Sequence, residues 1–270
     1  MMRAKCTILS LAVSAALAAA STTAHAAEPW VDRPNTLPRL TFAGNAGLGV
    51  VHLGAGPLDE TGAGVNLEGA FGVTDRLELG LRTGVRIGDG GRFTSADAYG
   101  RTLQTETYGT RADTFANPEL RVRGNLVRTS IFELALEGRV FMPFETASRF
   151  GAMFGVPLAL HLGSFVRIDT GAYVPVVFTD PAGTVFSVPA YVWFQPTDRL
   201  FLGPMFGARF VNAGTTTSRE DFLLGFGLGY AATSFLDLKT MLLFPRINGT
   251  EGGRNVGVGF GVEIRIGSGA

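Results

Sequence analysis

Hydrophobic and polar residues alternate along most of this chain with a period of two. In residues 72–88, GVTDRLELGLRTGVRIG, Glu78 and Arg82 occupy one parity and Leu79 and Leu81 the other. Successive side chains of a β-strand point to opposite faces. The stretch therefore predicts a strand with one ionic face and one apolar face.

The same alternation recurs in twelve segments. They span residues 39–51, 65–73, 77–87, 119–127, 132–142, 154–162, 166–176, 187–195, 199–210, 221–230, 236–242 and 256–266. Their apolar parity carries no Asp, Glu, Lys or Arg. A soluble β-sandwich also alternates, but it tolerates some charge on either parity. Because an arginine or lysine facing lipid near the membrane midplane costs about 2–4 kcal/mol, we expect the apolar face to meet lipid and the ionic face to line a lumen.

The connections between the segments alternate between short and long. Short ones fall at 74–75, 128–130, 163–164, 197–198 and 233–234, and long ones near 54–62, 88–116, 143–149, 179–184, 212–220 and 246–254. Outer-membrane barrels have short periplasmic turns, longer outer loops and an even number of strands. Closure also removes the unpaired edges that lipid cannot satisfy. The predicted fold is all-β: a transmembrane, antiparallel, up-and-down β-barrel of about 12 strands over residues 39–266, with the loop 88–116 as a candidate lid.

The N-terminus has the three parts of a secretory signal peptide. Basic residues precede an apolar run at 7–20, and the run is followed by the A-x-A pattern of residues 24–26. We expect residues 1–26 to be removed and the barrel to reach the outer membrane through the barrel-assembly machinery. Residues 27–38 are then a Pro-rich periplasmic lead, and the pattern leaves open whether this lead enters the lumen. The only cysteine, Cys6, lies in the signal peptide, so the mature chain has no disulfide or cysteine-based metal site.

Charge adds a prediction for the lumen. The chain has 23 basic and 23 acidic residues and no basic patch, which argues against nucleic acid as a partner. Both signs are interspersed on the inward parity near the periplasmic end, which predicts a mixed-charge constriction. Its expected members are Glu78, Arg82, Arg121, Arg123, Glu133, Glu137, Arg139, Arg167, Asp169, Asp237, Lys239, Glu263 and Arg265.

Another part of the inward parity is glycine-rich and aromatic. We expect Tyr173, Tyr191, Trp193 and Met205 to form an apolar wall of the lumen, because aromatic faces accommodate apolar solutes. The predicted function is an outer-membrane channel or transporter, without cofactor or metal, that passes small apolar or aromatic solutes.

Two alternatives stay open. A twelve-stranded barrel is intermediate between small barrels filled by side chains and open porins. The alternative to a channel is therefore a closed structural or surface-binding barrel that the charges plug. A lipid-modifying enzyme would have to use His52 near the first outer loop. The chain contains no G-x-S-x-G motif, and we expect no enzymatic activity.

Three stretches resemble one family of Gram-negative outer-membrane barrels. They are FGVTDRLELGL (71–81), NPELRVRGNLVR (117–128) and DRPNTLPRLTF (32–42). The family is assigned to a MetA pathway of phenol degradation. The resemblance implies outer-membrane passage of hydrophobic or aromatic small molecules, and it supplies no site residues. Asn117-Pro118 stands where the family often has Gly-Asp.

Overall fold

The structure, a computed structural model, describes residues 28–55, 58–87, 94–96, 103–105, 115–143, 150–178, 183–212, 218–249 and 253–267. The predicted signal peptide and most of the loop 88–116 lie outside these residues. The elements are η1 (Trp30–Asp32), β1 (Phe42–Ala55), β2 (Leu58–Thr74), β3 (Leu77–Ile87), β4 (Thr94–Ala96), β5 (Leu103–Thr105), β6 (Phe115–Arg128), β7 (Phe132–Phe141), β8 (Gly151–Leu162), β9 (Val166–Val177), β10 (Gly183–Phe194), β11 (Leu200–Asn212), β12 (Ser218–Ala231), β13 (Leu236–Phe244) and β14 (Asn255–Ile266).

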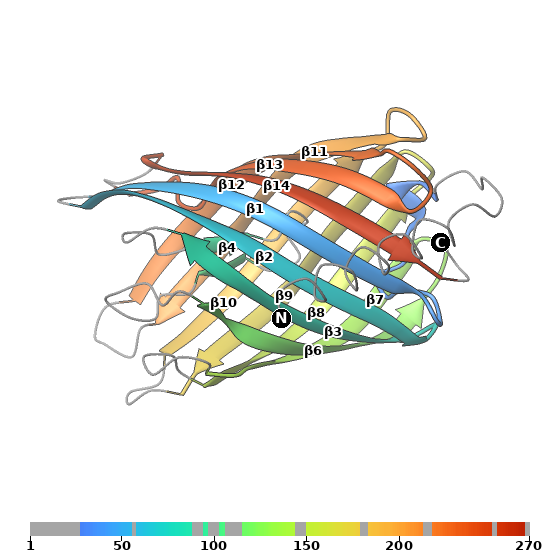
Figure 1. Ribbon diagram of the computed structural model, residues 1–270, viewed down its shortest axis with the longest axis horizontal. Coiled ribbons are helices and arrows are strands. Elements are labelled where there is room, and N and C mark those ends of the chain that lie inside the picture. Colours follow the sequence, from blue (N-terminus) through green and yellow to red (C-terminus); the bar gives the residue numbers. More distant parts are fainter. Residues whose placement is uncertain are drawn as a thin grey trace, which may run out of the picture.

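Twelve of these strands form one closed antiparallel barrel (Figure 1). Each strand pairs with its neighbours in the chain, β3 pairs with β6, and β1 closes the ring against β14. The five predicted short turns all lie at the end where the lead enters and where β14 ends. The predicted all-β, twelve-stranded barrel is confirmed. By the usual asymmetry of such barrels, the end with the short turns is periplasmic.

The outside of the barrel is apolar. Large hydrophobic side chains stand exposed on all twelve strands, and Leu81 and Phe260 show 51% and 57% of their surface. The inward parity holds the buried charged residues instead. A closed barrel with this surface belongs in a bilayer, where every backbone group is paired within the wall, so the chain is an outer-membrane protein. No helix among the described residues is long and apolar enough to cross a membrane.

The strands run further outward than the alternation predicted. A loop was expected at 54–62, but β1 continues to Ala55 and β2 starts at Leu58, with Gly54 opposite Asp59. Beyond the bilayer both faces of a strand meet water. The apolar parity therefore ends while the backbone pairing continues. Strands β4 and β5, in the expected long loop, pair with each other within the outline of the barrel.

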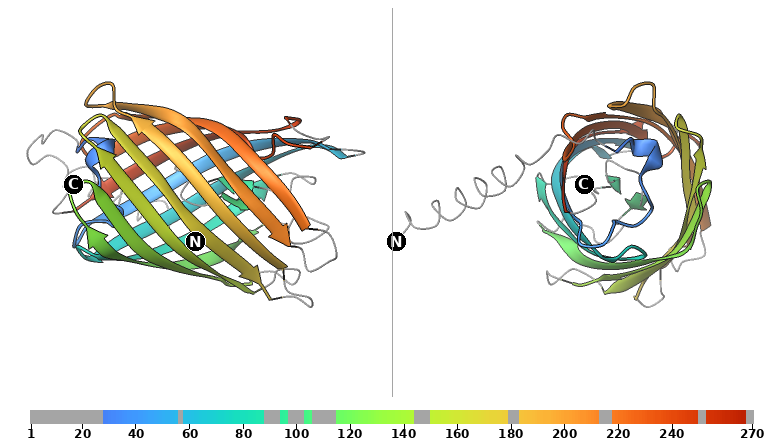
Figure 2. Two further views of the ribbon diagram at one scale, coloured as in Figure 1. Left: turned by 180° about the vertical axis from the view of Figure 1, so that it is seen from behind. Right: turned by 90° about the vertical axis from the view of Figure 1, so that its right-hand side faces the viewer.

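The lead turns into the barrel at its periplasmic end (Figure 2, right). The first strand begins at Phe42, three residues later than the pattern predicted, because residues 38–41 form a turn. Leu40 takes a positive φ of 60° there, and its N–H donates to the Gly72 carbonyl at 2.8 Å. A Cβ on Gly72 would overlap the Pro38 carbonyl. A residue without a side chain is thus required where the lead crosses β2.

Candidate functional site

The lead is bound to the lumen wall through its backbone amides. The N–H of Asn35 donates to Glu133 at 2.9 Å, and that of Leu37 donates to Glu78 at 2.8 Å. Both carboxylates belong to wall strands, β7 and β3, and both are buried. Hydrogen bonds to ionised acceptors are stronger than neutral ones. Two acidic residues of the predicted constriction therefore anchor the lead.

Arginines of the wall bind the carbonyls of the lead. Arg123 on β6 donates to the Asn35 carbonyl at 3.0 Å, and Arg167 on β9 donates to the Arg33 carbonyl. The Arg33 side chain makes a buried ion pair with Asp237 on β13. The lead thus reaches strands on opposite sides of the ring, and it crosses the mouth rather than following one wall.

Trp30, in the single turn η1, is the apolar anchor of the lead. Its ring stacks on Phe201 with centroids 4.6 Å apart and an interplanar angle of 7°, and it meets Trp193 edge-on at 5.9 Å. The Lys239 ammonium lies 4.5 Å from the ring centroid, a cation–π geometry. The apolar cluster around it consists of Trp30, Tyr191, Trp193, Phe201, Met205 and Met241.

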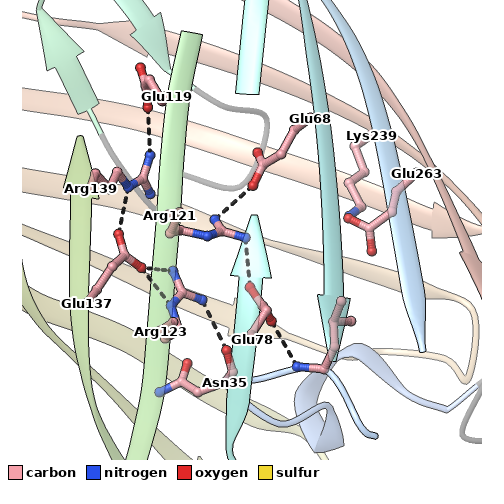
Figure 3. A network of polar contacts seen from close by, with 11 residues as sticks. Asn35, Glu68, Glu78, Glu119, Arg121, Arg123, Glu137, Arg139, Lys239 and Glu263 are labelled. Carbon is pink, nitrogen blue, oxygen red and sulfur yellow. Dashed lines mark hydrogen bonds and ion pairs between the residues drawn. The ribbon is translucent and has the colours of Figure 1, made fainter. Parts of the chain in front are cut away.

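Above the lead, one side of the lumen carries two neighbouring groups of ion pairs (Figure 3). Arg121 bridges Glu68 and Glu78 at 2.7 Å each. It therefore links β2, β3 and β6 across the inside of the wall.

The other group on this side lies on β6 and β7. Glu137 is shared by Arg123 and Arg139, and Arg139 also reaches Glu119 at 3.2 Å. Removing one partner of a buried ion pair leaves an uncompensated charge and costs about 3–5 kcal/mol. Since every carboxylate here contacts at least one arginine, this side of the lumen is ionic without a large net charge.

A further ionic group lies on β13 and β14. Lys239 contacts Glu263 at 3.1 Å and Asp237 at 3.9 Å, and Arg265 contacts Glu263 at 2.6 Å. Through the pair of Asp237 with Arg33, this group also binds the lead.

The structure places all thirteen predicted charged residues on the inward side, in separate groups rather than one ring. Arg167 and Asp169 pair with each other on β9 at 2.7 Å. Within the part of the chain that the structure describes, both terminal nitrogens of buried Arg82 lack a hydrogen-bond partner.

The four residues of the predicted apolar wall point inward but do not line one open surface. Tyr191, Trp193 and Met205 pack in the Trp30 cluster, whereas Tyr173 packs with Phe141 and Met153. The sequence left open whether the lead enters the lumen, and in the structure its Trp30 packs among three of these side chains.

Sequence reasoning missed several residues of this site. Trp30, Arg33 and Asn35 lie in a segment without periodicity, so no pattern signals their partners. Phe201 was also missed, although its parity opposite Leu200 and Leu202 does indicate an inward position.

A small cavity lies directly above the lead. Its volume is about 20 Å³, which is enough for one water molecule. Its lining residues are Asn35, Arg123, Pro157, Leu158, Asp169, Thr170, Tyr173, Pro189 and Tyr191. It is thus bounded by the lead, the ionic side of the lumen and two residues of the predicted apolar wall.

Comparison with known proteins supports the architecture. No family model matches the chain, and no curated protein matches it in sequence. The NanC porin aligns over 83% of this chain and 100% of its own, with a TM-score of 0.58 and 8% identity. The COG4313 outer membrane channel from Pseudomonas putida F1 aligns over 87% and 99%, with a TM-score of 0.56 and 12% identity. The KdgM porin aligns over 82% and 98%, with a TM-score of 0.53 and 7% identity.

The chain has the fold of outer-membrane channels. At these identities the likeness concerns the fold alone, and the resemblance to the phenol-degradation family stays a prediction. Among the described residues no group of three or more His, Cys, Asp or Glu side chains could hold a metal ion. His52 lies on β1, with its Nδ1 3.1 Å from the Thr61 hydroxyl in an exposed position.

Proposed function

We propose that this protein is an outer-membrane channel for small apolar or aromatic solutes, and that its lead closes the periplasmic mouth in the state described. The observation that carries the proposal is that the lead lies across the periplasmic mouth and is bound to wall residues on several strands. The lead is not a strand of the wall. It is held by contacts to side chains of the wall, such as the Asn35 N–H with Glu133 and the Arg33 side chain with Asp237, which can separate without opening the barrel.

The lining supports the solute class. The two tyrosines beside the cavity, Tyr173 and Tyr191, offer aromatic faces, and Pro157 and Pro189 add apolar surface. The KdgM porin has been solved in complex with disordered oligogalacturonate. The lumen here pairs its arginines with glutamates, which disfavours a solute with many negative charges.

Single-channel recording tests the proposal. The refolded chain from residue 27 is compared in planar bilayers with a variant that lacks residues 27–39. We expect brief or small openings for the full chain, a larger and steadier conductance for the variant, and block of that conductance by benzyl alcohol. Absence of conductance in a variant shown to be folded and inserted would overturn the proposal in favour of a closed structural barrel.

A further inference from the structure

Asn35, which lines the cavity above the lead, has an unused hydrogen-bond donor. The side-chain amide nitrogen of Asn35 is buried, and no described residue accepts from it. The other groups of Asn35 are occupied. Its N–H donates to Glu133, its carbonyl accepts from Arg123 at 3.0 Å, and its side-chain oxygen lies 3.4 Å from Arg167.

A buried donor without an acceptor costs about 1–3 kcal/mol, and buried polar groups in proteins are nearly always paired. Asn35 lines the cavity, and Figure 3 shows it beside Arg123. The molecule that enters the cavity must therefore supply an acceptor. An oxygen meets that need. Arg123 beside Asn35 is paired with Glu137, and the Asp169 carboxylate in the lining is paired with Arg167, so the charges around the cavity are balanced.

The other side of the cavity combines two tyrosine rings with Asp169 and Thr170. Tyr173 and Tyr191 lie on the adjacent strands β9 and β10. Tyr191 pairs with Asp169 of β9, so Tyr173 lies closer to the outer end of the barrel than Tyr191 does. Pro157 and Pro189 complete this side. Tyrosine rings favour stacked or edge-on contact with another ring, so this side fits the ring of an aromatic molecule.

We propose that the cavity is the solute subsite of the channel and takes an aromatic molecule that carries a carboxylate or another acceptor oxygen. The oxygen accepts from the Asn35 side chain, and the ring packs against Tyr173 and Tyr191. The proposal rests on the proposed function, since a solute reaches this cavity through the lumen.

Binding at this subsite displaces the lead. The cavity holds a molecule the size of water, whereas an aromatic ring needs more space. Asn35 belongs to the lead, and the other lining residues belong to strands of the barrel wall. Asn35 is therefore the lining residue that can move without a change in the barrel. A solute that pushes Asn35 aside stretches its bonds to Glu133 and Arg123. Because binding and displacement favour the same state, each promotes the other.

The chain provides its own reporter for this event. Its two tryptophans are Trp30 on the lead and Trp193 on the wall, 5.9 Å apart. The probes are benzoate, acetate, which has the carboxylate without the ring, and toluene, which has the ring without an acceptor. Each is titrated into the refolded barrel in detergent while tryptophan emission is recorded.

We expect benzoate to change the emission with saturation, and acetate and toluene to act only at much higher concentration. Asn35→Asp, which replaces the donor by a carboxylate, should weaken benzoate binding by at least about tenfold. Asn35→Ala should weaken it less, and the exposed Asp32→Asn should match the unmodified chain. Tyr191→Phe keeps the ring and should retain binding.

Equal responses to all three probes, or the same benzoate affinity in Asn35→Asp, would overturn the subsite and leave a cavity filled by water. Conductance of the same preparations separates the two proposals. Conductance without benzoate binding would support the channel and overturn the subsite. Benzoate binding without conductance would support the subsite and overturn the channel.

Discussion

Trp30→Ala should release the lead from the barrel. The ring is 2% exposed, stacks on Phe201 and contacts Trp193 and Lys239. Replacing a buried tryptophan by alanine costs about 3–5 kcal/mol. Because Trp30 lies in a single helical turn outside the strands, where the backbone can relax, we take the lower value. A loss of about 3 kcal/mol lowers the ratio of bound to released lead by about 150-fold.

Amide hydrogen exchange measures this ratio directly. The N–H groups of Asn35 and Leu37 donate to wall carboxylates, so they exchange only when the lead is released, at a rate proportional to the released fraction. We expect both amides to exchange about 150-fold faster in Trp30→Ala. Amides inside the strands should keep their rates.

The matched control is Asp32→Asn, an exposed change in the same helical turn. It should leave both amides protected. Exchange in Trp30→Ala within about threefold of the unmodified chain would refute the reasoning, because the aromatic cluster would then contribute little to holding the lead. Faster exchange throughout the strands would instead mean that the substitution destabilises the barrel itself.

Two further predictions concern the wall. Leu136→Arg places a charge on the lipid face at a cost of about 2–4 kcal/mol and should reduce the heat-modifiable folded band in outer-membrane fractions, whereas Leu136→Phe should not; equal bands would contradict the assignment of faces. Gly227→Ala adds a Cβ 2.7 Å from the Trp193 ring, while in Gly259→Ala the nearest atom is 3.7 Å away. The first should lower stability in thermal unfolding by about 1–3 kcal/mol and the second should not; the same midpoint for both would show that the cluster adapts to the methyl group.

The strands could be predicted because their signal is local. Whether Leu136 faces lipid and Glu137 faces the lumen depends only on the pleat and on the solvent at each face. Strand ends beyond the bilayer could not be predicted in the same way, since the alternation stops near Gly54 and Asp59 while the backbone pairing continues.

The candidate site was predicted as a set of residues but not as an arrangement. Parity placed Arg121 and Glu78 in the lumen, yet it could not show that Arg121 also binds Glu68. Such partners come from three different strands. Their contact depends on barrel closure and register, which no single segment contains.

The sequence by itself determined the number of strands, their faces and the ionic character of the lumen. Successive side chains of each strand face lipid and the lumen in turn, so apolar and polar residues alternate. Only the tertiary structure decided what fills the mouth. Trp30 and Phe201 are far apart in the chain and meet because the closed barrel brings β11 beside the lead. The lead has no periodicity of its own, so its position follows from the pockets and charges that the finished barrel offers.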